Sequence, residues 1–268
     1  MNRLKGKAAV VLGAAGAGNM GQVIARRFRD EGADVVVAGR DAAELARFAS
    51  EINGHAVICD ITRKADIEAL AEAAAAKMGG IDIAVNATGW GLIKPFLDTT
   101  EEELDRMVAL QFKGPFHFFQ AMAAAMAEGA GQNRGGSIIQ ISSATATIML
   151  DDHAAYMGTK AGTDHVVRCV ANEFGAKGVR ANSISPGLTD TPMTAGAKAV
   201  PGLFDAFLPR YPLGRIGTSA DIAAAAVWLA SDECFMTGEN LQINGGLTLR
   251  GNPRAEDIQR SVMAVAGA

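Results

Sequence analysis

The sequence predicts an α/β fold, a doubly wound parallel sheet of about seven strands with helices on both faces. Two observations support this prediction. Short runs rich in β-branched residues alternate with segments of helical spacing from near the start to about residue 245. The chain also has 268 residues, 49% of them hydrophobic, without a break in composition that would mark a second domain. We therefore expect a single domain over residues 1–268.

Six brief apolar runs are the candidate strands. They are rich in valine, isoleucine and alanine, which is typical of strands that are buried on both faces. In chain order they are Lys7–Leu12, Asp34–Ala38, Ala56–Cys59, Ile83–Val85, Ser137–Ile141 and Arg180–Ile184.

Helices are expected between these strands, because apolar residues recur there at spacings of three and four. The first three series are Met20, Val23, Ile24 and Phe28; Leu45, Phe48 and Ile52; and Ile67 with Leu70. Two segments depart from the alternation, the proline-rich stretch 191–212 and the tail 251–268. We expect the stretch 191–212 to form a lid over a site at the carboxyl ends of the strands.

Charge and cysteine content argue against several functions. A formal net charge of -4 gives no sign of a surface for nucleic acid or for an anionic membrane, and the longest apolar run, 222–230, is too short to span a bilayer. Cys59, Cys169 and Cys234 are widely spaced, which argues against a disulfide framework or a zinc site and fits a cytoplasmic protein. We expect no metal, and we expect Cys169 and Cys234 to lie in the core.

A glycine-rich motif directly follows the first strand. Gly13 opens it, and Gly16, Gly18 and Gly21 match G-x-G-x-x-G immediately before a helix. In this context, backbone amides and the positive end of the helix can hold the pyrophosphate of a dinucleotide. The chain has 31 glycines, so an ordinary turn is the alternative, but the position after strand one favours the dinucleotide.

The end of the second strand bears on the choice of dinucleotide. Gly39 and Arg40 follow this strand about 20 residues beyond the loop, where an acidic residue would bind the 2′-hydroxyl of NAD. The guanidinium of Arg40 instead offers donors for the 2′-phosphate of NADP, so NADP is favoured. The neighbouring Asp41 leaves NAD possible, and a solvated arginine is a further alternative.

Tyr156 and Lys160 form the candidate catalytic pair. A spacing of four places both side chains on one face of a helix. Acid or base chemistry near neutral pH requires a tyrosine pKa about three units below 10, roughly 4 kcal/mol, and one cation a few ångströms away supplies about that much. Ser143 follows the strand Ser137–Ile141 at the sheet edge where ligands bind.

These motifs together resemble the short-chain dehydrogenase/reductase family from about Leu4 to Gly246. The matching segments are the glycine loop, Cys59-Asp60-Ile61, Val85-Asn86-Ala87-Thr88-Gly89, Ile141-Ser142-Ser143, Tyr156-Met-Gly-Thr-Lys160, Asn182-Ser-Ile-Ser-Pro186-Gly187 and Asn244-Gly245-Gly246. The resemblance implies a Rossmann-type enzyme that moves hydride between a nicotinamide and a carbonyl or alcohol. It also implies a homotetramer or homodimer.

The resemblance assigns roles to individual residues. Tyr156 would protonate the carbonyl oxygen, Ser143 would hydrogen-bond it, and Lys160 would bind the nicotinamide ribose and lower the pKa of Tyr156. Asp60 would lie at the adenine, Asn86 beside the cofactor backbone and Thr191 at the carboxamide. The expected cofactor-binding residues are Gly13, Gly16, Gly18, Asn19, Met20, Gly21, Arg40, Asp60, Ile61, Asn86, Ala87, Tyr156, Lys160, Pro186, Gly187 and Thr191.

Three features depart from the family's pattern. Leu12 replaces a threonine before the glycine loop, and the stretch from Gly13 to Gly21 is two positions longer than usual. The stretch Asn86–Gly89 keeps only the first of two asparagines. Gln111 replaces an asparagine that kinks its helix and holds a water linked to Lys160, so we expect Gln111 to be a fourth catalytic residue or else a slower proton relay.

The substrate is the least constrained feature. Five residues stand where the family lines its substrate pocket, although each could instead pack in the core: Trp90, Met149, Met193, Phe204 and Phe207. His153 is expected to be a solvated loop residue. The sequence favours an NADP(H)-dependent 3-oxoacyl thioester reductase. The alternatives are a sugar, polyol, steroid or xenobiotic alcohol dehydrogenase, and a dinucleotide-binding sensor without turnover.

Overall fold

The fold is that of a computed structural model, which describes residues 2–128 and 135–267. Seven parallel strands form its central sheet in the order β3-β2-β1-β4-β5-β6-β9. Their bounds are β1 Ala8–Leu12, β2 Asp34–Gly39, β3 His55–Ile58, β4 Ile83–Asn86, β5 Gly136–Ile141, β6 Val179–Pro186 and β9 Asn240–Ile243. The predicted doubly wound α/β architecture is confirmed.

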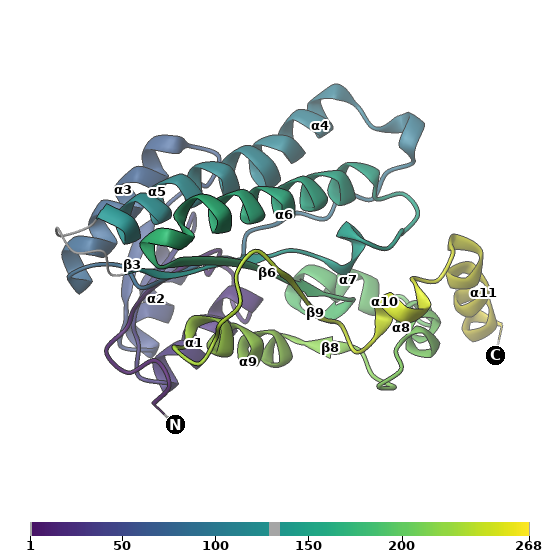
Figure 1. Cartoon of the computed structure of the whole chain (residues 1–268). Coiled ribbons are helices and arrows are strands. Elements are labelled where there is room, and N and C mark those ends of the chain that lie inside the picture. Colours follow the sequence, from purple (N-terminus) through teal and green to yellow (C-terminus); the bar gives the residue numbers. More distant parts are fainter. Residues whose placement is uncertain (1, 129–134, 268) are drawn as a thin grey trace.

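Two helical layers cover the sheet because successive strand residues face opposite sides. Val11 and Val35 pack in one core with helices α1 (Met20–Asp30), α2 (Ala42–Glu51) and α9 (Ser219–Ala230). Val10 and Val36 pack in the other with α3 (Lys64–Met78), α5 (Gly114–Glu128) and α6 (Ala154–Phe174). Figure 1 shows α5 and α6 on one side of the sheet and α1 and α9 on the other.

A long helical segment runs across the outside of the second layer. It consists of α4 (Glu101–Val108), the π-helical turn η2 (Ala109–Lys113) and α5. Short elements join the main ones: the 3-10 turns η1 (Phe96–Asp98), η4 (Ala144–Ala146) and η5 (Gly175–Lys177). Within the described residues, no helix is long and apolar enough to cross a membrane.

The segment that the sequence left irregular contains short helices. They are η6 (Pro192–Thr194), α7 (Ala195–Lys198), α8 (Leu203–Phe207) and η7 (Leu208–Arg210). The parallel pair β7 (Thr189–Asp190) and β8 (Gly217–Thr218) brackets this segment. After β9 come α10 (Leu247–Arg250) and α11 (Ala255–Ala266), and α11 packs beside α8 at the end of the molecule distant from β3 (Figure 1).

Candidate active site

A cavity of about 620 Å³ opens at the carboxyl ends of the central strands. This edge is where parallel α/β sheets bind ligands, because the loops after the strands diverge there. Ten of the residues predicted for the site line the cavity: Asn19, Met20, Gly21, Ala87, Ser143, Tyr156, Lys160, Pro186, Gly187 and Thr191. The structure therefore brings together residues from four loops that are far apart in the sequence.

The glycine loop keeps a tight path despite its two additional positions. Gly13 has a φ of +102°, and a Cβ there would lie 2.7 Å from the carbonyl carbon of Ala87. A Cβ at Gly21 would lie 2.5 Å from the carbonyl oxygen of Gly13. Asn19 ties the turn together, because its side-chain amide donates to that same oxygen at 2.8 Å and its carbonyl oxygen accepts from the amide of Gln22 at 3.0 Å.

The loop presents free backbone donors to the cavity. Among the described residues, the amides of Met20 and Gly21 at the start of α1 have no hydrogen-bond partner. Both residues line the cavity, and the helix dipole adds positive potential at this point. This arrangement fits the pyrophosphate of a dinucleotide, which needs backbone donors and no intervening side chain.

Four predicted cofactor residues lie farther from the cavity wall. Gly16 and Gly18 form the outer part of the loop, and Arg40 and Asp60 lie at the ends of β2 and β3. Burial raises the pKa of Asp60, but hydrogen bonds from Thr62 and, to a smaller extent, the charge of Arg40 lower it below its usual value. Asp60 accepts two hydrogen bonds from Thr62. This end of the groove is where the loop would lead the adenosine half of a dinucleotide.

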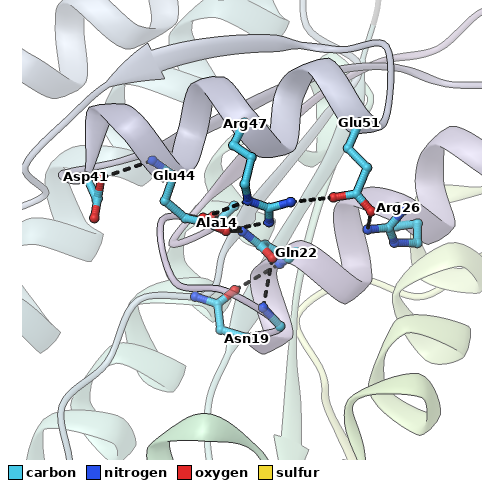
Figure 2. A network of polar contacts seen from close by, with 9 residues as sticks. Ala14, Asn19, Gln22, Arg26, Asp41, Glu44, Arg47 and Glu51 are labelled. Atoms are coloured by element: carbon cyan, nitrogen blue, oxygen red, sulfur yellow. Dashed lines mark hydrogen bonds and ion pairs between the residues drawn. The ribbon is translucent and has the colours of Figure 1, made fainter.

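Acidic side chains near Arg40 are already occupied. Asp41 caps α2 by accepting from the amide of Glu44, and Glu44 pairs with Arg47 at 2.7 Å (Figure 2). These hydrogen bonds, first from Arg47 and then from Gln22, lower the pKa of Glu44 to about 2. In the described part of the chain, Arg40 itself forms no hydrogen bond or ion pair, so its guanidinium is available to a ligand.

Gln22 couples this charged cluster to the glycine loop. Its buried side-chain amide donates to Glu44 at 2.7 Å and to the carbonyl of Ala14 at 3.1 Å, while its oxygen accepts from the amide of Gly18 at 2.9 Å (Figure 2). The phosphate loop and the start of α2 are thereby fixed relative to each other. Nothing in the sequence pattern singles out Gln22 for this role.

Asn86 and Ile61 do not line the cavity and lie in the protein interior behind it. Asn86 is fully buried, donates to the side-chain oxygen of Gln140 at 2.9 Å and accepts from the hydroxyl and amide of Thr88. Thr88, which departs from the family's pattern, thus holds the turn after β4. The side chain of Ile61 is buried in the core and does not line the cavity.

Ser143 and Tyr156 stand together at the end of β5. Ser143 lies in the turn between β5 and η4, where its hydroxyl lies 2.8 Å from the hydroxyl of Thr145. Tyr156 lies in the first turn of α6, where burial raises the pKa of its phenol and the neighbouring Ser143 hydroxyl has a smaller, lowering effect. Two hydroxyl groups that converge in this way can donate to an oxygen that gains negative charge.

Lys160 is almost fully buried one helical turn beyond Tyr156. Its ammonium donates to the carbonyl of Ile141 at 2.8 Å and lies 5.7 Å from the centre of the Tyr156 ring. Burial lowers the pKa of Lys160 to about 8. Burial raises the pKa of the Tyr156 phenol in this arrangement, and the lowering of that pKa by Lys160 stays a prediction.

Gln111 occupies the π-helical turn between α4 and α5. The turn frees the backbone carbonyl of Gln111, which accepts from the hydroxyl of Thr163 at 2.6 Å. The side-chain nitrogen of Gln111 donates to the carbonyl of Trp90 at 3.3 Å, and its buried oxygen has no partner among the described residues. A Cβ built on Gly89 would lie 3.5 Å from this oxygen and 3.9 Å from the Lys160 nitrogen, so both polar groups face Gly89.

The far wall of the cavity is mostly apolar. Of the five residues predicted to line it, Met193 and Phe207 do so, whereas Trp90, Met149 and Phe204 do not. Additional apolar lining comes from Ile93, Leu150, Leu188, Leu203, Leu247 and Ile258. His153 also lies on the wall, half-exposed and with its Nδ1 atom 2.6 Å from the carbonyl oxygen of Asp151, and the expectation of a solvated side chain stays a prediction.

Helix α11 roofs this end of the cavity through Ala255, Ile258 and Gln259. The carboxylate of Asp151, in the loop before Tyr156, accepts from the amide of Ala255 at 3.0 Å. On the other side, Ser261 donates to the carbonyl of Gly202 at 2.7 Å. The tail therefore joins the loop before α6 to the segment that carries α8.

An ion pair also joins α11 to the segment that carries α8. Arg210 in η7 pairs with Asp257 in α11 at 3.0 Å.

One cysteine expectation is wrong: Cys169 is exposed on α6, whereas Cys234 is buried.

Comparison with known proteins places the chain. A family model described as enoyl-(acyl carrier protein) reductase matches residues 13–248. D-threitol dehydrogenase of Mycolicibacterium smegmatis is 36% identical over 92% of this chain and 95% of its own length. The chain belongs to the short-chain dehydrogenase/reductase family. As a member, it is an oxidoreductase that transfers hydride between a nicotinamide dinucleotide and an alcohol or carbonyl group.

Other members of the family share the sequence and the architecture. 3beta-hydroxysteroid dehydrogenase 1 of Eggerthella lenta is 35% identical over 92% of this chain and 95% of its own. A crystal structure of a 3-ketoacyl-(acyl-carrier-protein) reductase from Brucella melitensis complexed with NADH has a TM-score of 0.83 and 30% identity, and it covers 91% of this chain and 99% of that one. The family members that are similar to this chain are thus named for different substrates.

Proposed function

We propose that this short-chain dehydrogenase/reductase uses NADP(H) to interconvert a ketone and a secondary alcohol with a hydrocarbon body. The observation that carries the proposal is the shared cavity, in which Ser143, Tyr156 and Lys160 face a wall of aliphatic and aromatic side chains. When bound, the nicotinamide supplies or accepts the hydride. The chain's own residues must bind and orient the substrate and move one proton.

The proton would move at the hydroxyl of Tyr156. In ketone reduction this hydroxyl donates its proton to the carbonyl oxygen, while Ser143 holds the same oxygen by a hydrogen bond. Lys160 holds the ribose next to the nicotinamide, and its charge favours the tyrosinate that remains. Gln111 is the proposed fourth member, because its unpartnered oxygen faces the same side of Gly89 as Lys160 and could hold a water for reprotonation.

The preference for NADP(H) rests on Arg40. A 2′-phosphate at the end of β2 would meet a free guanidinium, since Asp41 and Glu44 are engaged by the start of α2 and by Arg47. A 2′-hydroxyl would meet Asp41 with one carboxylate oxygen already used in the cap of α2, and Glu44 engaged by Arg47. The remaining cofactor contacts are proposed for the glycine loop, Asp60, Asn86, Ala87, Pro186, Gly187 and Thr191.

The wall of the cavity favours one group of substrates. Six aliphatic side chains with Met193 and Phe207 suit an acyl chain or a fused ring. A 3-oxoacyl thioester and a steroid carry these groups. The same cavity also carries Asp152, Asn252 and Gln259, which are the partners that the hydroxyls of a polyol would require. As for many members of the family, we propose that the protein acts as a homodimer or homotetramer.

A substrate panel tests the proposed function. Ketones and secondary alcohols of the acyl, steroid and polyol classes are supplied with NADPH or NADP⁺, and parallel reactions contain NADH or NAD⁺. We expect turnover with apolar substrates and NADPH, and we expect Tyr156→Phe to lower kcat by at least about 100-fold, as the loss of a general acid should, without loss of cofactor binding. Near-normal turnover in this variant, or cofactor binding without turnover on any substrate, would refute the proposal and favour a sensor.

A further inference from the structure

Asp164 is a charged residue on α6 that the mechanism above does not use. It lies one helical turn beyond Lys160 and two turns beyond Tyr156, so all three side chains share one face of the helix. The carboxylate points at the sheet, where three strands each offer it one donor. Such a carboxylate is costly to bury unless its charge has a role or a partner.

The three donors come from neighbouring strands and their ends. The hydroxyls of Ser142, just after β5, and Ser183, in β6, each donate at 2.7 Å. The side-chain amide of Asn240 in β9 donates at 2.5 Å. An amide nitrogen can only donate, so Asp164 accepts at this contact. Burial raises the pKa of Asp164, and these hydrogen bonds together with the charge of Lys160 act in the opposite direction and favour the carboxylate.

The charged and titratable groups that face Asp164 are few. From α6 itself these are Lys160 and Tyr156, whereas the side chains that β5, β6 and β9 present are neutral. Among the described residues, Lys160 is the one cation that acts on its pKa. Asp164 therefore acts mainly on the two groups that are proposed to handle the proton and the ribose.

We propose that Asp164 is a positioning residue of the active site, whose half-buried negative charge keeps Lys160 protonated and whose hydrogen bonds fix Ser142 beside Ser143. The proposal deepens the function proposed above and rests on it for its catalytic consequence. Its electrostatic part, however, can be measured without any turnover. The sequence gives no hint of this role, because Asp164 belongs to none of the recognised motifs.

The sign of the effect follows from Coulomb's law. A negative charge stabilises the protonated form of every nearby group, so it raises the pKa of both Lys160 and Tyr156. Even with Asp164 in place, burial brings the pKa of Lys160 down to about 8. Without Asp164, the ammonium would lose its proton closer to neutral pH, and the pKa of Tyr156 would also fall.

The chain offers a direct readout of this effect. It contains two tyrosines, Tyr156 and Tyr211. Tyr211 is buried and donates to the carbonyl of Leu188, and burial raises its pKa far above the usual value. Because burial raises the pKa of both tyrosines, the phenolate absorbance of the parent, Tyr156→Phe and Tyr211→Phe during an alkaline titration assigns the transition of Tyr156.

The closing experiment compares Asp164→Asn with the parent protein. We expect the Tyr156 transition to move down by about half a pH unit, and we expect the basic limb of kcat/KM for ketone reduction to move down by about one unit from near pH 8. Asp232→Asn removes a carboxylate from an exposed ion pair with Lys7 and should move neither. Asp164→Glu, which keeps the negative charge, should give a Tyr156 transition and a basic limb close to those of the parent. Ser142→Ala also keeps the charge and should leave the titration near that of the parent.

The outcomes separate the two proposals. An unchanged Tyr156 titration in folded Asp164→Asn overturns the role of Asp164, whatever the activity. A shifted titration in a protein that reduces no ketone supports the role and refutes only the proposed function. If Asp164→Asn fails to fold, Asp164→Ser supplies a second neutral side chain that can still accept from the same donors, and it is judged by the same titration.

Discussion

Arg40 is the residue on which the cofactor preference depends. Its guanidinium is free, while the acidic groups around it are held by α2 and Arg47 (Figure 2). We expect Arg40→Ser to weaken NADPH binding by about 10- to 100-fold, the amount expected for losing charge-assisted hydrogen bonds to a phosphate, and to leave NADH binding within about twofold. Titration of both cofactors against intrinsic fluorescence measures this. An equal loss for NADH would show that Arg40 supports the fold of the groove and does not select the phosphate.

The candidate site was predictable where local sequence determines its geometry. The pair Tyr156 and Lys160 required only helical spacing, and Gly13 and Gly21 required only the backbone contacts of a tight loop. Asp164 was not predictable, because its meaning depends on Ser142, Ser183 and Asn240, which belong to three strands. The raised pKa of Tyr156 was also missed, since spacing alone does not show how deeply a phenol is buried.

Helix α11 is the element that should set the size of the substrate. Ile258 faces the cavity and packs near Phe207, whereas Met263 is exposed on another face of the same helix. We expect Ile258→Ala to lower kcat/KM for a bulky apolar ketone by about 5- to 30-fold, because contacts worth roughly 1–2 kcal/mol are removed, and to leave a small ketone nearly unaffected.

Met263→Ala is the matched control for this prediction and should have kcat/KM values near those of the parent. Thermal melting of both variants shows whether the fold is intact. An equal loss on large and small ketones, or the same loss in Met263→Ala, would show that α11 acts on stability and not on substrate contact.

Element boundaries followed the sequence closely where apolar runs are bounded by polar residues. The strand expected at Lys7–Leu12 is β1 at Ala8–Leu12, while β6 extends two residues beyond its apolar run because Ser185 and Pro186 pair with β9. The helix in the tail was not predicted, although Ile258, Val262 and Val265 stand at helical spacing. The position of this helix against the loop before α6 could not be predicted from the sequence, since the contacting residues Asp151 and Ala255 are 104 positions apart.

The whole molecule should respond to cofactor as a unit. The groove crosses the ends of β1, β2, β4, β5 and β6, so a bound dinucleotide contacts both halves of the sheet. At 100 times its dissociation constant, NADPH should add about 2.7 kcal/mol of stability and raise the melting temperature by about 5–10 °C. NADH at the same concentration should raise it less. Differential scanning fluorimetry measures both shifts, and a larger shift with NADH would contradict the preference for NADP(H).

The π-helical turn at Gln111 has a consequence for evolution by insertion and deletion. One extra residue separates α4 from α5 there, and each residue turns an α-helix by about 100°. A π turn spreads about the same rotation over one more residue, so loss of one residue in 109–113 would leave the face of α4 nearly unchanged. It would, however, return the carbonyl of Gln111 to the helix and remove its hydrogen bond from Thr163. The chain should therefore accept many substitutions in this turn and resist every change in its length.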